Sequence, residues 1–131
     1  MVKKLFLHPQ EIETFYILPT LRRYFALHLK ERGMMQKDIA DMLMINSATI
    51  SQYSSTKRGH KITFNDFILK EIKKSAENMH DQISYIRETQ RILKVIRISG
   101  AICEIHKQVS VVPNGCEQPV TGCHTTLRST A

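Results

Sequence analysis

The sequence contains no tryptophan, and glycine and proline are scarce, with five and four in 131 residues. It also has no apolar run approaching the roughly 20 residues that a membrane-spanning helix needs. The first apolar stretch, within MVKKLFLHPQ, is too short for the core of a secretory signal. We therefore expect a cytoplasmic chain with no membrane partner. Its three cysteines would stay reduced there, so disulfides are not expected.

Sequence motifs of catalysis are missing as well. No nucleophile elbow, phosphate-binding loop or arrangement of paired carboxylates occurs. The scattered serines and histidines are most simply surface polar groups. We expect that the chain is not an enzyme.

The charge is positive and unevenly distributed. The formal net charge is +7, and residues 101–131 contribute none of it, because they hold two basic and two acidic residues. A basic body with a neutral tail suits contact with phosphates, which supply most of the non-specific affinity for DNA. Many proteins are basic for other reasons, so charge alone does not identify a partner.

Residues 36–55, QKDIADMLMINSATISQYSS, have the pattern of two short helices joined by a tight turn. Counted from Gln36, apolar residues fall at positions four, eight, ten, fifteen and eighteen, namely Ile39, Leu43, Ile45, Ile50 and Tyr53. Ala40 lies at position five, where the helices cross closely. This spacing predicts a helix-turn-helix, whose second helix enters the major groove of DNA. The alternative is a helical hairpin in a core, with no role in nucleic-acid binding.

The turn of this motif departs from the usual pattern at position nine. Glycine is usual there because the backbone needs a positive φ, but this chain has Met44. A non-glycine residue adopts that conformation at a cost of about 1 kcal/mol. Asn46 and Ser47, which follow, suit a turn and a helix N-cap.

The second helix and the segment after it carry the residues expected to touch DNA. Gln52 has the amide best suited to pair with adenine, and the basic segment 54–61 would lie beside the DNA backbone. The residues expected to reach base edges are Asn46, Ser47, Ala48, Ser51, Gln52 and Ser55. Those expected to contact phosphates are Gln36, Thr49, Lys57, Arg58 and Lys61.

Two further stretches read as helical. Residues 9–32 predict two helical pieces that start at Pro9, meet near Pro19 and end at Gly33. From residue 64 to residue 99 no proline or glycine interrupts the chain, and an apolar stripe recurs in steps of three and four. This stripe predicts either a dimer interface or a helix pair, broken near His80, that folds back on the core. The interface residues expected on the first interpretation are Ile72, Met79, Ile83, Ile86 and Leu93.

All three cysteines fall in the irregular tail, residues 100–131. Cys103 and His106 have the two-residue gap that lets both side chains reach one metal ion. Together with Cys116 and Cys123 they would complete a site of three thiolates and one imidazole, for zinc or for an iron–sulfur cluster. No Cys-x-x-Cys pair is present, and a cysteine in such a chain is often just a small buried apolar residue. No cofactor is certain.

Three segments, EIETFYILPTLRRYFA, QKDIADMLMINSATISQYSSTKRG and ISGAICEIHK, resemble a group of predicted transcriptional regulators, mostly archaeal, with a lambda-repressor-like helix-turn-helix. The first matches the family's Glu-led helix with a central Leu-Pro, here residues 11–21. The second matches its Ala-x-Ile-Ser-Gln-Tyr recognition helix and the following Lys-Arg-Gly, at residues 48–53 and 57–59. The third matches a Ser-Gly, a Cys and a His, here at 99, 100, 103 and 106. Members of the group often carry cysteines just upstream, whereas residues 84–98 contain none. The resemblance implies sequence-specific binding to DNA.

The expected protein is all-α: a helix-turn-helix bundle, then a long helix or helix pair, then an irregular Cys-containing tail. The expected divisions are a DNA-binding domain at 1–62, a dimerisation segment at 63–99 and the tail at 100–131. The expected function is a homodimeric transcriptional regulator that binds double-stranded DNA. The alternative is an antitoxin-like or protein-interaction module that uses the same helices to bind a protein partner.

Overall fold

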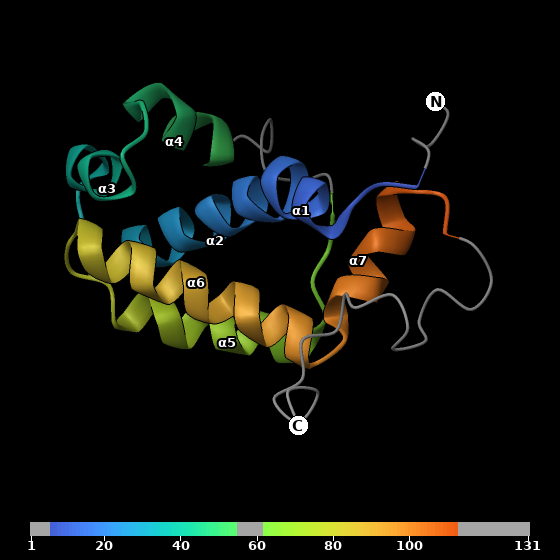
Figure 1. Cartoon of the computed structure of the whole chain (residues 1–131). Helices are drawn as coiled ribbons and strands as arrows, with labels where there is room; N and C mark the ends of the chain where they lie inside the picture. Colours follow the sequence, from blue (N-terminus) through green and yellow to red (C-terminus); the bar gives the residue numbers. More distant parts are fainter. Residues whose placement is uncertain (1–5, 55–61, 113–131) are drawn as a thin grey trace.

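A computed structural model describes residues 6–54 and 62–112, and these residues form an all-helical bundle without strands (Figure 1). The expected all-α class is therefore confirmed. The elements are α1 (Pro9–Ile12), a π-helical turn η1 (Glu13–Ile17), α2 (Leu18–Glu31), α3 (Gln36–Leu43), α4 (Ser47–Ser54), α5 (Asp66–Glu77), α6 (Gln82–Ile98) and α7 (Ala101–Val109). Among the described helices, none has the length and apolar character needed to cross a membrane.

The two expected helical pieces at the N-terminal end are present, and the irregularity between them lies just before Pro19. The first piece begins at Pro9, where the Glu11 carboxylate accepts a hydrogen bond from the His8 N–H at 2.9 Å. The π-helical turn η1 ends at Ile17, and α2 follows directly from Leu18, with Pro19 as its second residue. Because proline has no N–H and clashes with the preceding turn, the regular α-helical hydrogen bonding is interrupted there.

The end of α2 is closed by Gly33, as its position predicted. Gly33 has φ +92°, its N–H donates to the Lys30 carbonyl, and the Met34 N–H donates to the Leu29 carbonyl. This pair of bonds is the Schellman motif, which turns the chain sharply out of a helix. The turn directs α3 away from the end of α2.

The uninterrupted stretch 64–99 forms two helices rather than one. The chain leaves α5 after Glu77 and starts again at Gln82, with Asp81 as the N-cap that accepts from the Ser84 N–H at 2.7 Å. The first helix begins at Asp66 with Asn65 as its N-cap, because the Asn65 side chain accepts from the Ile68 N–H at 2.9 Å. The helix-pair alternative, broken near His80, is the one observed.

Because α5 and α6 pack against the core, only some residues of the apolar stripe remain exposed to a partner. Ile72 and Met79 are fully buried within one chain and Leu93 is 8% exposed, so these three residues belong to the core. The expectation that they line a dimer interface is wrong for that reason. Ile83 and Ile86 are 77% and 47% exposed and remain accessible.

The first part of the expected irregular tail is a helix. Gly100, with φ +81°, ends α6 and serves as the N-cap of α7. Ala101, Ile102 and Ile105 bury the inner face of α7 against the rest of the bundle. Residues 101–109 are thus part of the folded body.

One hydrophobic core joins residues of the expected first and second segments. It is built around Leu21, Phe25 and Leu29 of α2, and it includes side chains from α3, α4, α5, α6 and α7. Figure 1 shows α5 and α6 side by side along α2, with α3 and α4 at one end of the bundle and α7 at the other. The core holds α3 and α4 at the surface of that end.

Candidate nucleic-acid interface

The helices α3 and α4 are joined by a short turn whose backbone has the conformation that the motif requires. Met44 has φ +56° and ψ +44°, the left-handed region, and is the one non-glycine residue with positive φ among those described. The Ile45 N–H then donates to the Ala40 carbonyl at 3.0 Å, which closes α3. On the far side of the turn, the Asn46 side chain accepts from the Ala48 N–H at 2.7 Å and caps α4.

The position of α4 is set by its buried face. Ile50 and Tyr53 are 1% and 4% exposed and pack into the core with Ile39 and Leu43 of α3. Ala40 is also buried, at the close approach of the two helices. These residues are those of the expected apolar pattern, and their burial leaves the opposite face of α4 toward solvent.

The strain at Met44 gives a prediction about stability. The Met44 side chain is 54% exposed, so it contributes little burial, while its left-handed backbone costs about 1–2 kcal/mol. Glycine removes that strain, whereas alanine keeps it. We expect Met44→Gly to be more stable than Met44→Ala by about 1 kcal/mol in urea denaturation. Equal stability of the two variants would contradict the strained turn.

The exposed face of α4 is polar and uncharged, and α3 holds part of it in place. Ser47, Ala48 and Ser51 are exposed. The Gln36 Nε2 lies 2.9 Å from the Ser47 carbonyl, 3.0 Å from its Oγ and 2.9 Å from the Ser51 Oγ. Because a carbonyl only accepts, the contact with it fixes the orientation of the Gln36 amide. This amide ties the first turn of α3 to the first two turns of α4.

The other described residues expected to touch DNA are placed less favourably. Gln52 is half-buried and its Oε1 is shielded from solvent, so an amide pairing with adenine would need another side-chain conformation. Thr49 is half-buried, and the Asn46 oxygen is engaged in the cap. The remaining predicted contacts, Ser55, Lys57, Arg58 and Lys61, lie outside the described residues.

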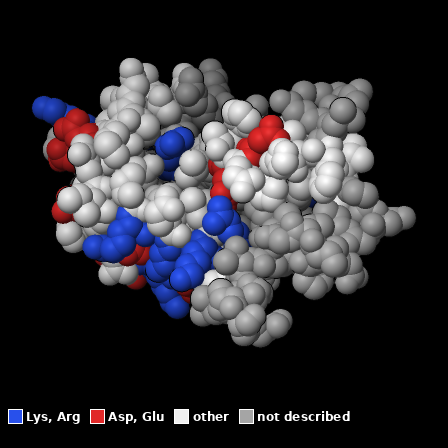
Figure 2. All heavy atoms as spheres, in the orientation of Figure 1, with Lys and Arg blue, Asp and Glu red and all other residues white. Residues whose placement is uncertain are grey.

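The described surface of α4 carries no charge, and most visible basic groups lie elsewhere. Figure 2 shows Lys and Arg gathered over α5 and α6, whereas the surface over α4 is uncoloured. On α3, Lys37 is exposed together with Asp38 and Asp41. Lys37 is the one basic residue of α3 and α4, and the basic residues of the segment 55–61 lie outside the described residues.

The expected metal ligands are only partly described. Cys103 and His106 lie one turn apart on α7, and Cys116 and Cys123 lie outside the described residues. Burial is the main influence on His106 and lowers its pKa, against a hydrogen bond with the Leu7 backbone that raises it. The described residues show no group of three or more metal-binding side chains.

The ring of His106 packs against the segment that precedes α1. It is 4% exposed and stacks on Phe6, with ring centroids 5.4 Å apart. The Leu7 N–H donates to the Ser110 Oγ at 3.0 Å on the same side of the molecule. Together these contacts fasten the segment before α1 onto α7. The Nε2 of His106 is buried and has no hydrogen-bond partner among the described residues.

Comparison of the chain with models of known protein families, with curated proteins and with solved structures finds no match. The function is therefore inferred from the residues and geometry of α3 and α4.

Proposed function

We propose that this protein binds double-stranded DNA through α3 and α4 and acts as a transcriptional regulator. The observation that carries the proposal is the exposed polar face at the start of α4, whose Ser47 and Ser51 are held by the Gln36 amide. A helix presented in this way fits the major groove, which is about 12 Å wide. Serine hydroxyls both donate and accept, and the Ala48 methyl suits the methyl group of thymine.

Gln36 has a positioning role in this proposal. Its amide nitrogen is engaged with α4 in the free protein, so it orders the side chains that would meet base edges. The first backbone N–H groups of α3 lie beside it and favour an anion such as a phosphate. A sequence-reading face that is ordered before binding loses less entropy when it binds.

The proposal includes a homodimer, because regulators of this kind read two half-sites about one helical turn apart. Ile83 and Ile86 support this part, since they expose apolar surface on the first half of α6. That part of α6 adjoins α3, and the Gln82 amide donates to the Asp41 carbonyl at 2.9 Å. A second copy that covered these isoleucines would lie next to the α3–α4 pair.

The proposal is tested by titrating a 30-base-pair duplex with the full chain at several salt concentrations. We expect the affinity to fall on a log–log plot with a slope steeper than about −3, which corresponds to release of counterions from three or more phosphates. A flat dependence, or no binding, would favour the protein-interaction alternative.

A matched variant locates the interface. Lys73→Glu with Lys94→Glu reverses two exposed charges of α5 and α6, away from α4. We expect this variant to keep most of the affinity. Loss of nearly all binding would move the interface to the α5–α6 face.

A further inference from the structure

A cavity of about 750 Å³ lies between α2 and α5, beside the faces of these helices that are buried in the core. On each helix the lining residues recur at steps of three and four, and they flank the core stripes formed by Phe25 and Leu29 on α2 and by Ile68 and Ile72 on α5. The volume is within the range of about 300–1,000 Å³ that small-molecule sites usually have.

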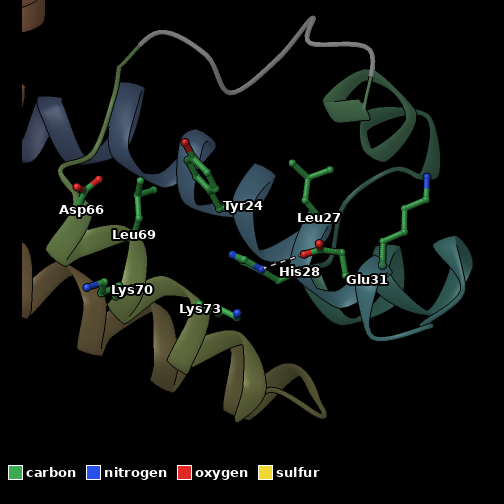
Figure 3. A pocket seen from close by; sticks show the side chains of 9 residues that line it. Tyr24, Leu27, His28, Glu31, Asp66, Leu69, Lys70 and Lys73 are labelled. Carbon is green, nitrogen blue, oxygen red and sulfur yellow. Dashed lines mark ion pairs between the residues drawn. The ribbon is translucent and has the colours of Figure 1, made fainter.

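The walls of the cavity are mainly apolar. Tyr24 and Leu27 of α2 and Leu69 of α5 are partly buried and line it (Figure 3). Tyr24 is held by its neighbours: its ring lies 5.9 Å from that of Phe64, and the Arg23 guanidinium lies 5.3 Å from its centroid. A preformed apolar surface of this kind suits a hydrocarbon or aromatic group.

The rim of the cavity carries more basic than acidic side chains: Lys30, Lys70 and Lys73 line it together with Glu31 and Asp66. Lys70 and Lys73 are exposed on α5, and neither forms an ion pair with a described residue. The adjacent Lys74, in contrast, pairs with Glu71 at 3.2 Å. Across the cavity the Glu31 carboxylate lies 3.4 Å from the His28 Nδ1 (Figure 3).

We propose that this cavity binds a small organic anion with an apolar body. The anionic head lies at the α5 rim of the cavity, within the positive field of Lys70 and Lys73, and the hydrocarbon or aromatic body packs on Tyr24, Leu27 and Leu69. Two ammonium groups on neighbouring turns of one helix attract a single carboxylate or sulfonate more strongly than either would alone. The apolar walls reject a small hydrophilic anion, because it would leave them without contact.

The cavity is placed to influence the α3–α4 pair. Its wall helix, α2, also contacts both α3 and α4. A ligand that shifts α2 relative to α5 would change the support under α4. This regulatory consequence rests on the proposed DNA-binding function, whereas the binding of the anion does not.

The binding itself is tested by calorimetric titration of the full chain with decanoate, below its micellar concentration. Acetate and decyltrimethylammonium serve as probes that lack the apolar body and the negative charge. We expect saturable binding of one decanoate per chain, and at least tenfold weaker binding of either probe. Equal affinity for decyltrimethylammonium, or no binding of decanoate, would overturn the proposal.

Variants place the site. The double variant Lys70→Glu with Lys73→Glu should weaken decanoate binding at least tenfold, and thermal melting checks that it is folded. The control, Lys37→Glu with Lys94→Glu, changes two exposed lysines outside the cavity and should bind decanoate as the wild type does. Equal affinity of the wild type and the cavity variant would also overturn the proposal. DNA titration without decanoate tests the proposed function separately, so failure of one is distinguishable from failure of the other.

Discussion

Replacing Ser47 with glutamate is expected to lower the affinity of the protein for the duplex that it is proposed to recognise at least a hundredfold, while leaving the fold intact. Ser47 is exposed in the first turn of α4, at the face proposed to enter the major groove. A carboxylate there would meet the negative potential of the phosphates, and like charges at an interface cost several kcal/mol. The same carboxylate lies near the positive end of the helix dipole, which stabilises acids by about 0.3–1 kcal/mol.

Ser47→Glu should therefore weaken DNA binding without destabilising the fold, so the two effects can be told apart. Ser47→Gln is the control of equal size without charge, and Gln10→Glu adds the same charge at an exposed position on α1. We expect Ser47→Gln to lose less affinity than Ser47→Glu, and Gln10→Glu to bind nearly as well as the wild type. Fluorescence anisotropy with a labelled duplex measures binding, and thermal melting checks the fold. Unchanged affinity of Ser47→Glu would exclude the first turn of α4 from the interface.

Replacing Arg91 with methionine is expected to lower the free energy of unfolding by about 2 kcal/mol. The Arg91 guanidinium lies between α5 and α6, where it donates to the Glu71 Oε1 at 2.8 Å, the Ser75 Oγ at 2.7 Å and the Glu88 Oε1 at 3.2 Å. Glu88 is 6% exposed, and without Arg91 its desolvated carboxylate would keep Arg87 as its one charged partner. The expected loss is at the lower end for a buried pair because the Arg91 side chain is 37% exposed.

A second variant distinguishes the loss of a charged partner of Glu88 from the loss of packing around Arg91. Adding Glu88→Gln to Arg91→Met removes the buried charge that has lost one of its two partners, and should restore part of the stability in urea denaturation. A single variant as stable as the wild type, or a double variant with no recovery, would contradict the importance of this network.

The same network gives a dependence on pH with a defined sign. Hydrogen bonds from Arg91 and Lys74 are the main causes that lower the pKa of Glu71. Desolvation is the largest influence on Glu88 and would raise its pKa, but hydrogen bonds from Ser75, Arg87 and Arg91 outweigh it, and the pKa is lowered. Carboxyls with lowered pKa in the folded state stabilise it above their ordinary value of 4.5 and lose this contribution as the pH falls further. We therefore expect the difference in stability between wild type and Arg91→Met to shrink below pH 4.5.

The apolar pattern of residues 36–55 predicted the geometry of α3 and α4 well. Positions such as Ile39, Ile50 and Tyr53 are buried where the pattern put them, and Met44 adopts the positive φ that its position requires. Gly33 ends its helix as expected. Local rules sufficed here because helix periodicity and chain reversals depend on a few neighbouring residues.

The apolar stripe did not predict whether α5 and α6 form one helix or two, because it runs through the break between them. Sustained steps of three and four fit one long helix and a folded pair equally well, and burial against α2 decides between them. The capping pair Asp81 and Ser84 is a local signal that favours a new helix start at that point. α7 was missed because its nine residues adjoin a segment rich in glycine and proline.

Side-chain direction at the candidate interface was harder to predict than helix position. Gln52 and Ser51 are neighbours in sequence, yet Ser51 is exposed and the Gln52 Oε1 is shielded. The bond from Gln36 to Ser51 joins residues of two helices, so it depends on how these cross. The cavity between α2 and α5 likewise results from the spacing of two helices, which no sequence pattern specifies.

Selection from a random pool of duplex DNA at moderate salt would show whether α3 and α4 recognise a DNA sequence. We expect the wild type to enrich, over several rounds, a palindrome with half-sites about one helical turn apart. The Ser47→Glu protein should enrich nothing from the same pool. Binding without enrichment of any sequence by the wild type, or enrichment of the same palindrome by Ser47→Glu, would contradict sequence recognition by α3 and α4.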